Sequence, residues 1–351
     1  MKKNVVYILG AGFSAPLGIP VMRNFIDEAR KIRRRDDAKY GYFSEVIDLV
    51  KQTISAEKYF QHDSGNIEEA LSLLEMKSSI ESDSPKDSLV KFIVDVIKAS
   101  TPPVPESDLT NVPKPRWNHI FTTDRKWQGY CALVASLNHL EFVDEGSSIL
   151  VKKGKPDVRY SILSLNYDMV LENACAFLNK FFVHESGESV AFRQTPDVVT
   201  DIVSPRLLKI HGSVDTGNII PPTLHKGLYG KDLPIPWRNA YDILAQAHEI
   251  RVIGYSLPQT DSYIRYLLMA SIDHLRDLDC IDWIVRDASG KVKERFEEFV
   301  RFKNKRFRKA DSADYLSEVF GRAVNTQWDK SGPLNFDKLE QAHDAFMSLP
   351  S

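Results

Sequence analysis

The 351-residue sequence has few cysteines, almost no net charge and no long apolar runs, and each shortage excludes a class of protein. The three cysteines, Cys131, Cys175 and Cys280, are too few and too scattered for a disulfide framework or a ribbon of paired zinc-binding cysteines. No apolar stretch approaches the length of a membrane span. The formal charge of −2 gives no whole-chain field that would attract nucleic acid or an anionic membrane.

We expect no secretory signal at the start of the sequence. The apolar stretch at residues 5–9 is shorter than the ~7 residues that the apolar region of a signal needs, and Gly10 and Gly12 follow it directly. We interpret this stretch as a buried first strand and expect a cytoplasmic protein that binds no membrane. With 43% hydrophobic and 27% charged residues, the composition is that of an ordinary folded protein.

Five short runs rich in β-forming residues predict strands, at residues 5–10, 161–165, 207–211, 250–255 and 281–285. Most of them are almost continuously apolar, as is typical of strands buried on both faces of a parallel sheet. Helical patterns follow several of these runs, and Asp168 is well placed to cap one of the helices. The alternation predicts an α/β fold with a Rossmann-like, doubly wound parallel sheet.

The chain between the first strand and residue 161 has a different pattern. Apolar residues recur at helical spacing over residues 46–54, 67–74 and 89–97, and a proline-rich loop at 101–115 precedes a further helix at 124–137. We therefore predict a helical insertion at residues 33–142. It divides one α/β domain into residues 1–32 and 143–310, and residues 311–351 form a C-terminal extension.

A glycine-containing turn follows the first strand, with the sequence Gly10-Ala11-Gly12-Phe13-Ser14-Ala15. This pattern, GxGxx(G/A), allows the backbone to approach a pyrophosphate at a helix N-terminus, although by itself it is a weak signal. A dehydrogenase usually carries an acidic residue ~20 residues further on, at the end of its second strand. Here the basic run at residues 31–35 takes that place, which disfavours hydride transfer.

Four segments, taken together and in order, resemble the sirtuin (silent information regulator) family. The segment GAGFSAPLGIPVMR at residues 10–23 is similar to the family signature GAGxSxxxGIP followed by an arginine. The others are NYD at 166–168, KIHGS at 209–213 and GYSL at 254–257. The tyrosine of NYD, the IIPP run at 219–222 and GYSLPQTD at 254–261 are most similar to the bacterial sirtuin-like group of antiphage defence systems, in which the domain hydrolyses NAD.

The resemblance implies a sirtuin-like, NAD-binding catalytic domain that acts as an NAD glycohydrolase and releases nicotinamide and ADP-ribose. It implies the NAD-depleting effector of an antiphage (abortive infection) system. Because such an enzyme is toxic to its host and must be held inactive until a signal arrives, we expect a homo-oligomer or a partner such as an ATPase. The near-neutral charge predicts no direct binding of nucleic acid. The matching catalytic residues are Asn166 and His211. The matching NAD-binding residues are Gly10, Ala11, Gly12, Ser14, Ile19, Pro20, Arg23, Asp168, Gly254, Tyr255 and Ser256.

General chemistry points to the same catalytic pair. Nicotinamide leaves from a cationic ring, so cleavage mainly requires stabilisation of an oxocarbenium-like ribosyl centre and a positioned nucleophile. A histidine can act as a general base, and an asparagine amide can orient ribose and water without charge. Asn166 and His211 both end predicted strands, and ligands bind parallel sheets at the carboxyl ends of their strands.

Two departures from the family pattern put protein deacylation in doubt. Sirtuin deacylases carry a module with four zinc-binding cysteines, which three dispersed cysteines cannot build, and Val21 replaces the aspartate of the family's GIPDFR. The alternatives to a glycohydrolase are an NAD-dependent protein deacylase and a non-catalytic sensor of NAD or ADP-ribose.

Other residues have a simpler structural interpretation beside the functional one. Asp168 serves as a helix cap, as a contact for nicotinamide or ribose, or as both. The basic clusters at 30–35 and 301–309 are interpreted as solvated helix ends, although Phe302 and Phe307 in the second would also suit nucleic acid. No metal site is expected, because the histidines show no ligand spacing, among them His62, His119, His225, His248 and His274.

Overall fold

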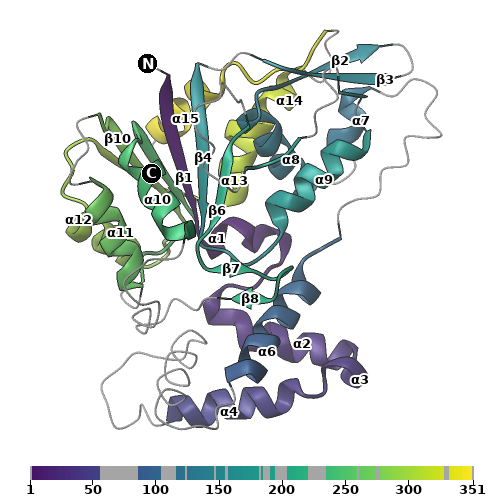
Figure 1. The fold of residues 1–351 in the computed structure, drawn as a ribbon, viewed down its shortest axis with the longest axis vertical. Helices are drawn as coiled ribbons and strands as arrows, with labels where there is room; N and C mark the ends of the chain where they lie inside the picture. The colour runs from purple at the N-terminus through teal and green to yellow at the C-terminus, as the bar shows by residue number, and fades with distance from the viewer. Residues whose placement is uncertain are drawn as a thin grey trace.

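A six-stranded parallel sheet forms the centre of the molecule in a computed structural model (Figure 1). The structure describes residues 2–55, 86–103, 116–122, 125–145, 148–154, 157–181, 183–184, 190–193, 204–219, 235–258, 261–272, 277–327 and 332–349. The strands of the sheet are β1 (Lys3–Leu9), β4 (Val158–Ser164), β6 (Arg206–Lys209), β9 (Glu249–Ile253), β10 (Cys280–Val285) and β11 (Lys305–Lys309).

The strands follow the spatial order β11-β10-β9-β1-β4-β6, and every neighbouring pair is parallel. Numbered along the chain, this is the 3-2-1-4-5-6 order of the doubly wound nucleotide-binding fold. The predicted Rossmann-like fold class is therefore confirmed, and all five predicted strands lie in the sheet.

The edge strand β11 corrects one interpretation of the sequence. Residues 305–309, KRFRK, are part of the cluster that we expected to be solvated helix ends, but they pair with β10 along its length. Alternate side chains of an edge strand point to opposite faces, and here Arg306 pairs with Asp282 while Phe307 packs against Phe296. The strand could not be recognised from the sequence, because its basic residues pair with partners that are distant along the chain.

Two helical layers cover the sheet (Figure 1). On one face, α10 (Ile235–Ala245), α11 (Ser262–Ile272) and α12 (Lys291–Phe299) pack against Val6 and Ile8 of β1. On the other face, Val5, Tyr7 and Leu9 pack against α8 (Arg125–Leu137), α9 (Val170–Phe181), α13 (Ser312–Tyr315) and α15 (Leu339–Ser348). This alternation along β1 follows the two-residue period of a strand and explains why its apolar run is continuous.

The helices α2 (Phe25–Arg35), α3 (Asp37–Tyr40), α4 (Phe43–Ser55) and α6 (Lys86–Ser100) form a separate layer, the helical lobe, beyond the carboxyl edge of the sheet (Figure 1). Their apolar faces share a third core, in which Phe92 contacts both Phe25 and Phe43. The predicted stripe at 67–74 lies outside the described residues. The boundaries at 33 and 142 stay a prediction, but α8 packs with the sheet and not with the lobe.

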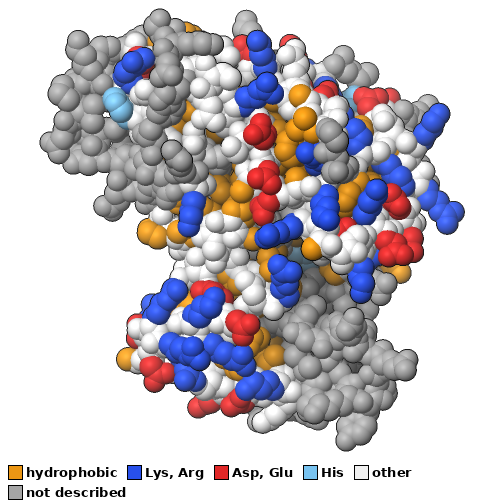
Figure 2. All heavy atoms as spheres, turned by 180° about the vertical axis from the view of Figure 1, so that it is seen from behind, with side chains coloured by type: hydrophobic (Ala, Val, Ile, Leu, Met, Phe, Trp, Pro, Cys, Tyr) orange, Lys and Arg blue, Asp and Glu red, His pale blue; other side chains and the backbone are white. Residues whose placement is uncertain are grey.

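The surface of the helical lobe carries both signs of charge (Figure 2). On α2, Arg30 pairs with Asp27 and Lys31 with Glu28, one turn apart, while Arg33 reaches Asp37. The cluster at residues 30–35 is thus a solvated helix end with acidic partners, as expected.

Short elements complete the described chain. A three-stranded sheet joins β2 (Leu140–Glu145), β3 (Ser148–Lys153) and β5 (Val183–His184), and β7 (Gly212–Ser213) pairs with β8 (Asn218–Ile219). The short helices are α1 (Ala11–Ser14), η1 (Ala15–Leu17), η2 (Met22–Asn24), α7 (Trp117–Thr122), η5 (Leu316–Phe320) and α14 (Gly321–Gln327). None of the helices among the described residues is long and apolar enough to span a membrane.

The C-terminal helix α15 binds the sheet through buried ionic contacts. Tyr7, Arg251, Asp282 and Arg306 form one row across β1, β9, β10 and β11. From α15, Glu340 accepts two hydrogen bonds from Arg251, and His343 bonds to Asp282 at 2.7 Å. Buried charges require such paired and hydrogen-bonded neighbours, so α15 completes this face of the sheet.

Candidate active site

The candidate site lies where the strand order reverses, between β1 and β9, because ligands of such sheets bind outside the carboxyl ends of the strands at this point. The glycine turn after β1 leads into α1 and η1, and Gly254 follows the end of β9. Figure 1 shows α1 at this edge, between the sheet and the helical lobe. The glycine turn therefore lies at the carboxyl end of β1, beside the point where the strand order reverses.

The two turns at this edge touch through their backbones. The N–H of Gly12 donates to the carbonyl of Gly254 at 2.9 Å, and a Cβ on Gly10 would lie 2.7 Å from that same oxygen. A Cβ on Gly254, whose φ is +67°, would lie 2.2 Å from the Phe13 nitrogen. These glycines were expected to make room for a pyrophosphate, but the room at these positions is used by the neighbouring turn.

Asn166 follows the end of β4 and is buried against the glycine turn. Its amide nitrogen donates to the carbonyl oxygen of Gly10 at 3.0 Å and to the hydroxyl of Ser14 at 3.3 Å. Its own backbone N–H donates to the Ser164 hydroxyl, which fixes the turn after the strand. The structure thus brings together three of the predicted site residues, from two strand ends.

Asp168 is buried beside Asn166 and caps helix α9. Its carboxylate accepts a hydrogen bond from the N–H of Val170 at 3.1 Å, so the predicted cap is present. Burial raises the pKa of this carboxyl, while the Ser14 hydroxyl, the Val170 N–H and the charge of Lys209 oppose the rise. Asp168 therefore faces the same small space as Ser14, which is compatible with both of the roles considered for it.

His211 follows β6 and is 2% exposed. Its ring lies between two aromatic rings, with centroid distances of 6.3 Å to Tyr167 and 6.0 Å to Trp237. The N–H of Val214 donates to the carbonyl of Tyr167 at 3.0 Å, so the turn after His211 is tied to the loop that carries Asn166. The two predicted catalytic residues thus lie on adjacent strand ends, β4 and β6, that are joined through Tyr167.

The remaining predicted NAD-binding residues divide between the interior and the surface. Tyr255 is buried, donates to Asp261 at 2.9 Å and stacks on Trp283. Ile19 and Pro20 are also buried, and Ala11 is half-buried in the glycine turn. Arg23, in η2, and Ser256, after β9, are exposed, so their side chains are open to solvent near the site.

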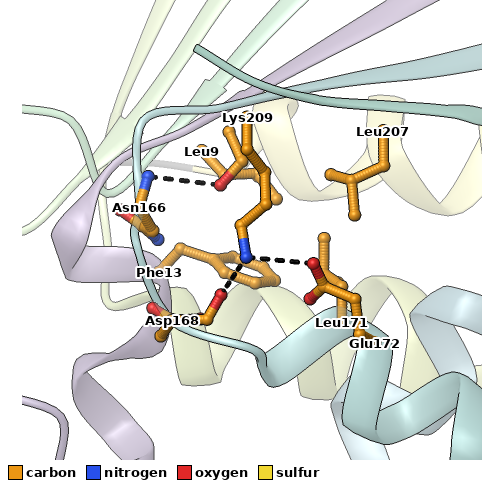
Figure 3. A pocket seen from close by; sticks show the side chains of 9 residues that line it. Leu9, Phe13, Asn166, Asp168, Leu171, Glu172, Leu207 and Lys209 are labelled. Atoms are coloured by element: carbon orange, nitrogen blue, oxygen red, sulfur yellow. Dashed lines mark hydrogen bonds and ion pairs between the residues drawn. The ribbon is translucent and has the colours of Figure 1, made fainter. Parts of the chain in front are cut away.

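Lys209 is a site residue to which the sequence analysis gave no role. It lines a small cavity with Asn166, Asp168 and Glu172, and its Nζ contacts oxygen atoms on both sides of the cavity (Figure 3). The cavity has a volume of about 10 Å³, which is room for a single water. A lysine within the apolar strand LLKIH was the available signal, since a buried charge requires partners.

Comparison with protein-family models gave no match, and comparison with curated proteins gave none either. Among solved structures, the chain is similar to Sir2Tm bound to a propionylated peptide, with 11% identity, a TM-score of 0.38, and coverage of 92% of this chain and 94% of that one. A Sir2–p53 peptide–NAD+ complex is 11% identical with a TM-score of 0.38, and the match covers 92% of this chain and 95% of that one. A structure described as the structural basis of sirtuin substrate affinity is 12% identical with a TM-score of 0.36, and the match covers 92% of this chain and 94% of that one. At such TM-scores the likeness carries no argument about the fold or the function of this chain. The fold assignment rests on the strand order of this chain.

Proposed function

We propose that this protein is an NAD glycohydrolase, with Asn166 and His211 as its catalytic residues. The observation that carries the proposal is the position of Asn166, which hydrogen-bonds to the glycine turn at the reversal point of a 3-2-1-4-5-6 sheet. His211 follows the next strand along the same edge. A nucleotide-binding sheet with an amide and an imidazole at adjacent strand ends suits cleavage of a glycosidic bond beside a pyrophosphate.

In the proposed reaction, water attacks C1′ of the ribose attached to nicotinamide, and the bond from C1′ to the ring nitrogen breaks. The electron pair of that bond leaves with nicotinamide, which becomes neutral, so no acid is needed for the leaving group. His211 takes the proton from the attacking water, and Asn166 orients the ribose and the water. Asp168, buried beside Asn166, is proposed to contact the ribose.

The binding of NAD to the described residues requires a change in the conformation of the protein. The cavity beside Asn166 and Asp168 holds a single water and is too small for a nicotinamide ring. The N–H groups of Gly10, Gly12 and Phe13 already donate within the protein. NAD binding is therefore proposed to move the glycine turn away from Gly254, with Arg23 and Ser256 as exposed partners for the phosphates.

The proposal extends to the biological setting that the sequence resemblance implies. An enzyme that depletes NAD harms its own cell, so it must be held inactive until a signal arrives. We propose a cytoplasmic effector of antiphage defence that acts as a homo-oligomer or with a partner protein such as an ATPase. The small volume of the cavity beside Asn166 and Asp168 is compatible with such restraint.

The test is to incubate the purified protein with NAD and to follow nicotinamide and ADP-ribose by liquid chromatography, with and without an acetylated peptide and with and without a zinc chelator. A glycohydrolase releases nicotinamide in all four mixtures. Release that appears only with the acetylated peptide, or that the chelator abolishes, would instead support the deacylase. Binding of NAD without any release would support the sensor.

A further inference from the structure

The ammonium group of Lys209 joins three segments around the candidate site. Its Nζ donates to the Glu172 carboxylate at 2.9 Å, to the Ser213 hydroxyl at 2.8 Å and to the backbone carbonyl of Asp168 (Figure 3). An ammonium has three hydrogens, so these three oxygens use its whole donor capacity. The side chain is 10% exposed, so the loss of any of these partners would leave a buried charge that is poorly compensated and would destabilise the protein.

The acceptors lie on the segments that carry the proposed catalytic residues. The Asp168 carbonyl belongs to the loop of Asn166, and Ser213 lies two residues after His211. Glu172 lies in the first turn of α9, which Asp168 caps. Lys209 itself lies on β6, two residues before His211, so one buried charge connects both sides of the site.

The charges in this cluster are balanced by Lys209. Burial raises the pKa of Glu172, and the charge and hydrogen bond of Lys209 oppose the rise. A hydrogen bond with the Ser213 hydroxyl, which accepts from Lys209, lowers the pKa of Asp215. The same hydroxyl contacts Sδ of Met169 at 3.2 Å. The cluster therefore runs without interruption from the buried Glu172 to the exposed Asp215.

We infer that Lys209 is a positioning residue for the proposed reaction, because it holds the loop of Asn166 and Asp168 in register with His211. This inference rests on the proposed function. A displacement of about 1 Å between reacting groups can cost about 10²-fold in rate, so an anchor between these two segments would be seen mainly in kcat.

A purely structural ion pair would behave differently when both partners are removed. Lys209→Met keeps the aliphatic stem but leaves Glu172 buried without its partner, which destabilises the protein. The double variant Lys209→Met/Glu172→Gln removes that unpaired charge and should regain most of the stability. If Lys209 positions the loop, the double variant still lacks the bond to the Asp168 carbonyl and stays slow.

The experiment compares the wild type, Lys209→Met, Glu172→Gln and the double variant. The control is Lys180→Met, which also removes one lysine but at an exposed position on α9. The measurements are the urea midpoint, kcat and KM for nicotinamide release, and the 15N NMR signals of the Asn166 amide and the His211 ring, assigned with Asn166→Ala and His211→Ala. We expect kcat in the double variant to fall about 10²-fold with KM changed less, while Lys180→Met matches the wild type.

Recovery of both stability and kcat in the double variant would overturn the inference. If the wild type releases no nicotinamide, the proposed function fails, and the NMR signals still decide the positioning role. Displaced signals of Asn166 and His211 in the folded double variant would support it, and unchanged signals would refute it.

Discussion

The side-chain amide of Asn166 donates to the backbone carbonyl of Gly10 at 3.0 Å and thereby joins the ends of β4 and β1. These neighbouring strands are distant in the sequence, because Leu9 pairs with Ser164, which lies 155 positions later. The bond has two consequences. It places an uncharged, orientable group at the reversal point of the sheet, and it makes the geometry of the glycine turn depend on one side chain.

The first prediction concerns the catalytic pair. His211→Ala and Asn166→Ala should each lower the rate of nicotinamide release by about 10²–10⁴-fold, because a positioned acid–base or orienting group is lost. Asn166→Ala should also cost about 1–3 kcal/mol of stability, since it removes the donor to two buried oxygens. Asn173→Ala, on α9, is the matched control. Folded variants that cleave NAD at the parental rate would refute the mechanism.

The second prediction uses two glycines with similar backbone strain and different surroundings. Gly18 and Gly254 both have a positive φ, but a Cβ on Gly18 meets nothing within 4 Å, whereas one on Gly254 meets the backbone of Gly12 and Phe13. Gly18→Ala should cost about 1–2 kcal/mol for the left-handed conformation. Gly254→Ala should cost about 1–3 kcal/mol more for the clash.

Equilibrium urea unfolding measures both variants. Equal losses of stability would show that the contact between the two turns is loose in solution. In that case the glycine turn would be free to receive a pyrophosphate without the movement that the proposed function requires.

The sequence predicted the interior of the fold better than its edges. The runs at β1, β4 and β9 are apolar on both faces, and that pattern is local, so these strands could be predicted from the sequence. The strand β11 could not be recognised, because Arg306 is satisfied by Asp282 and Asp344, which are distant in the sequence. Ion pairs of this kind leave no periodicity in the residues around them.

The same limit applies to the candidate site. Asn166 and His211 were found because they end apolar strands within a recognisable order of motifs. Lys209 lies within one of those motifs, but its role could not be predicted from the sequence. Its three acceptors come together only when β6, β7 and α9 are placed side by side in the fold. The small size of the cavity is likewise a property of packing and not of any motif.

The third prediction concerns the ionic attachment of α15. Burial pushes the pKa of Glu340 upward, but the charges and hydrogen bonds of Arg251 and Lys3 outweigh it and lower the pKa to about 2. Because the pKa in the folded state is lowered, this carboxylate stabilises the protein above the ordinary value of 4.5. The contribution is lost as the pH falls from there toward 2.

Glu340→Gln should therefore cost about 1.5–3 kcal/mol at neutral pH, because Arg251 is 1% exposed and would lose one of its two carboxylate partners while keeping Glu249. The stabilities of the wild type and the variant should converge as the pH falls from 4.5 toward 2. Asp344→Asn, on the same helix but with a carboxylate 61% exposed, should cost less than about 1 kcal/mol. Urea midpoints measured from about pH 3 to about pH 7, the range of carboxyl titration, give the comparison. A constant difference across the pH range would contradict the assignment.

The fourth prediction is that the helical lobe makes nicotinamide release depend on association. Tyr167, between Asn166 and Asp168, and Val214, after the His211 turn, are buried in the same core as Phe43 and Phe92 of the lobe. Any contact that shifts the lobe therefore moves both segments of the site. The apolar faces of α2, α4 and α6 are largely used within the chain, so a second subunit would have to bind the mixed-charge surface or rearrange the lobe.

We expect the specific activity per subunit to fall on dilution, in step with a decrease in mass measured by light scattering. Phe92→Leu, which loosens the lobe core without emptying it, should change this dependence while leaving the sheet folded, since Phe92 has no part in the sheet cores. Leu268→Met, on α11 in the opposite layer, is a control of similar size in a different core. A monomer with constant specific activity over the dilution series, unchanged by Phe92→Leu, would leave the lobe as a cover that stabilises the loops of Tyr167 and Val214 and nothing more.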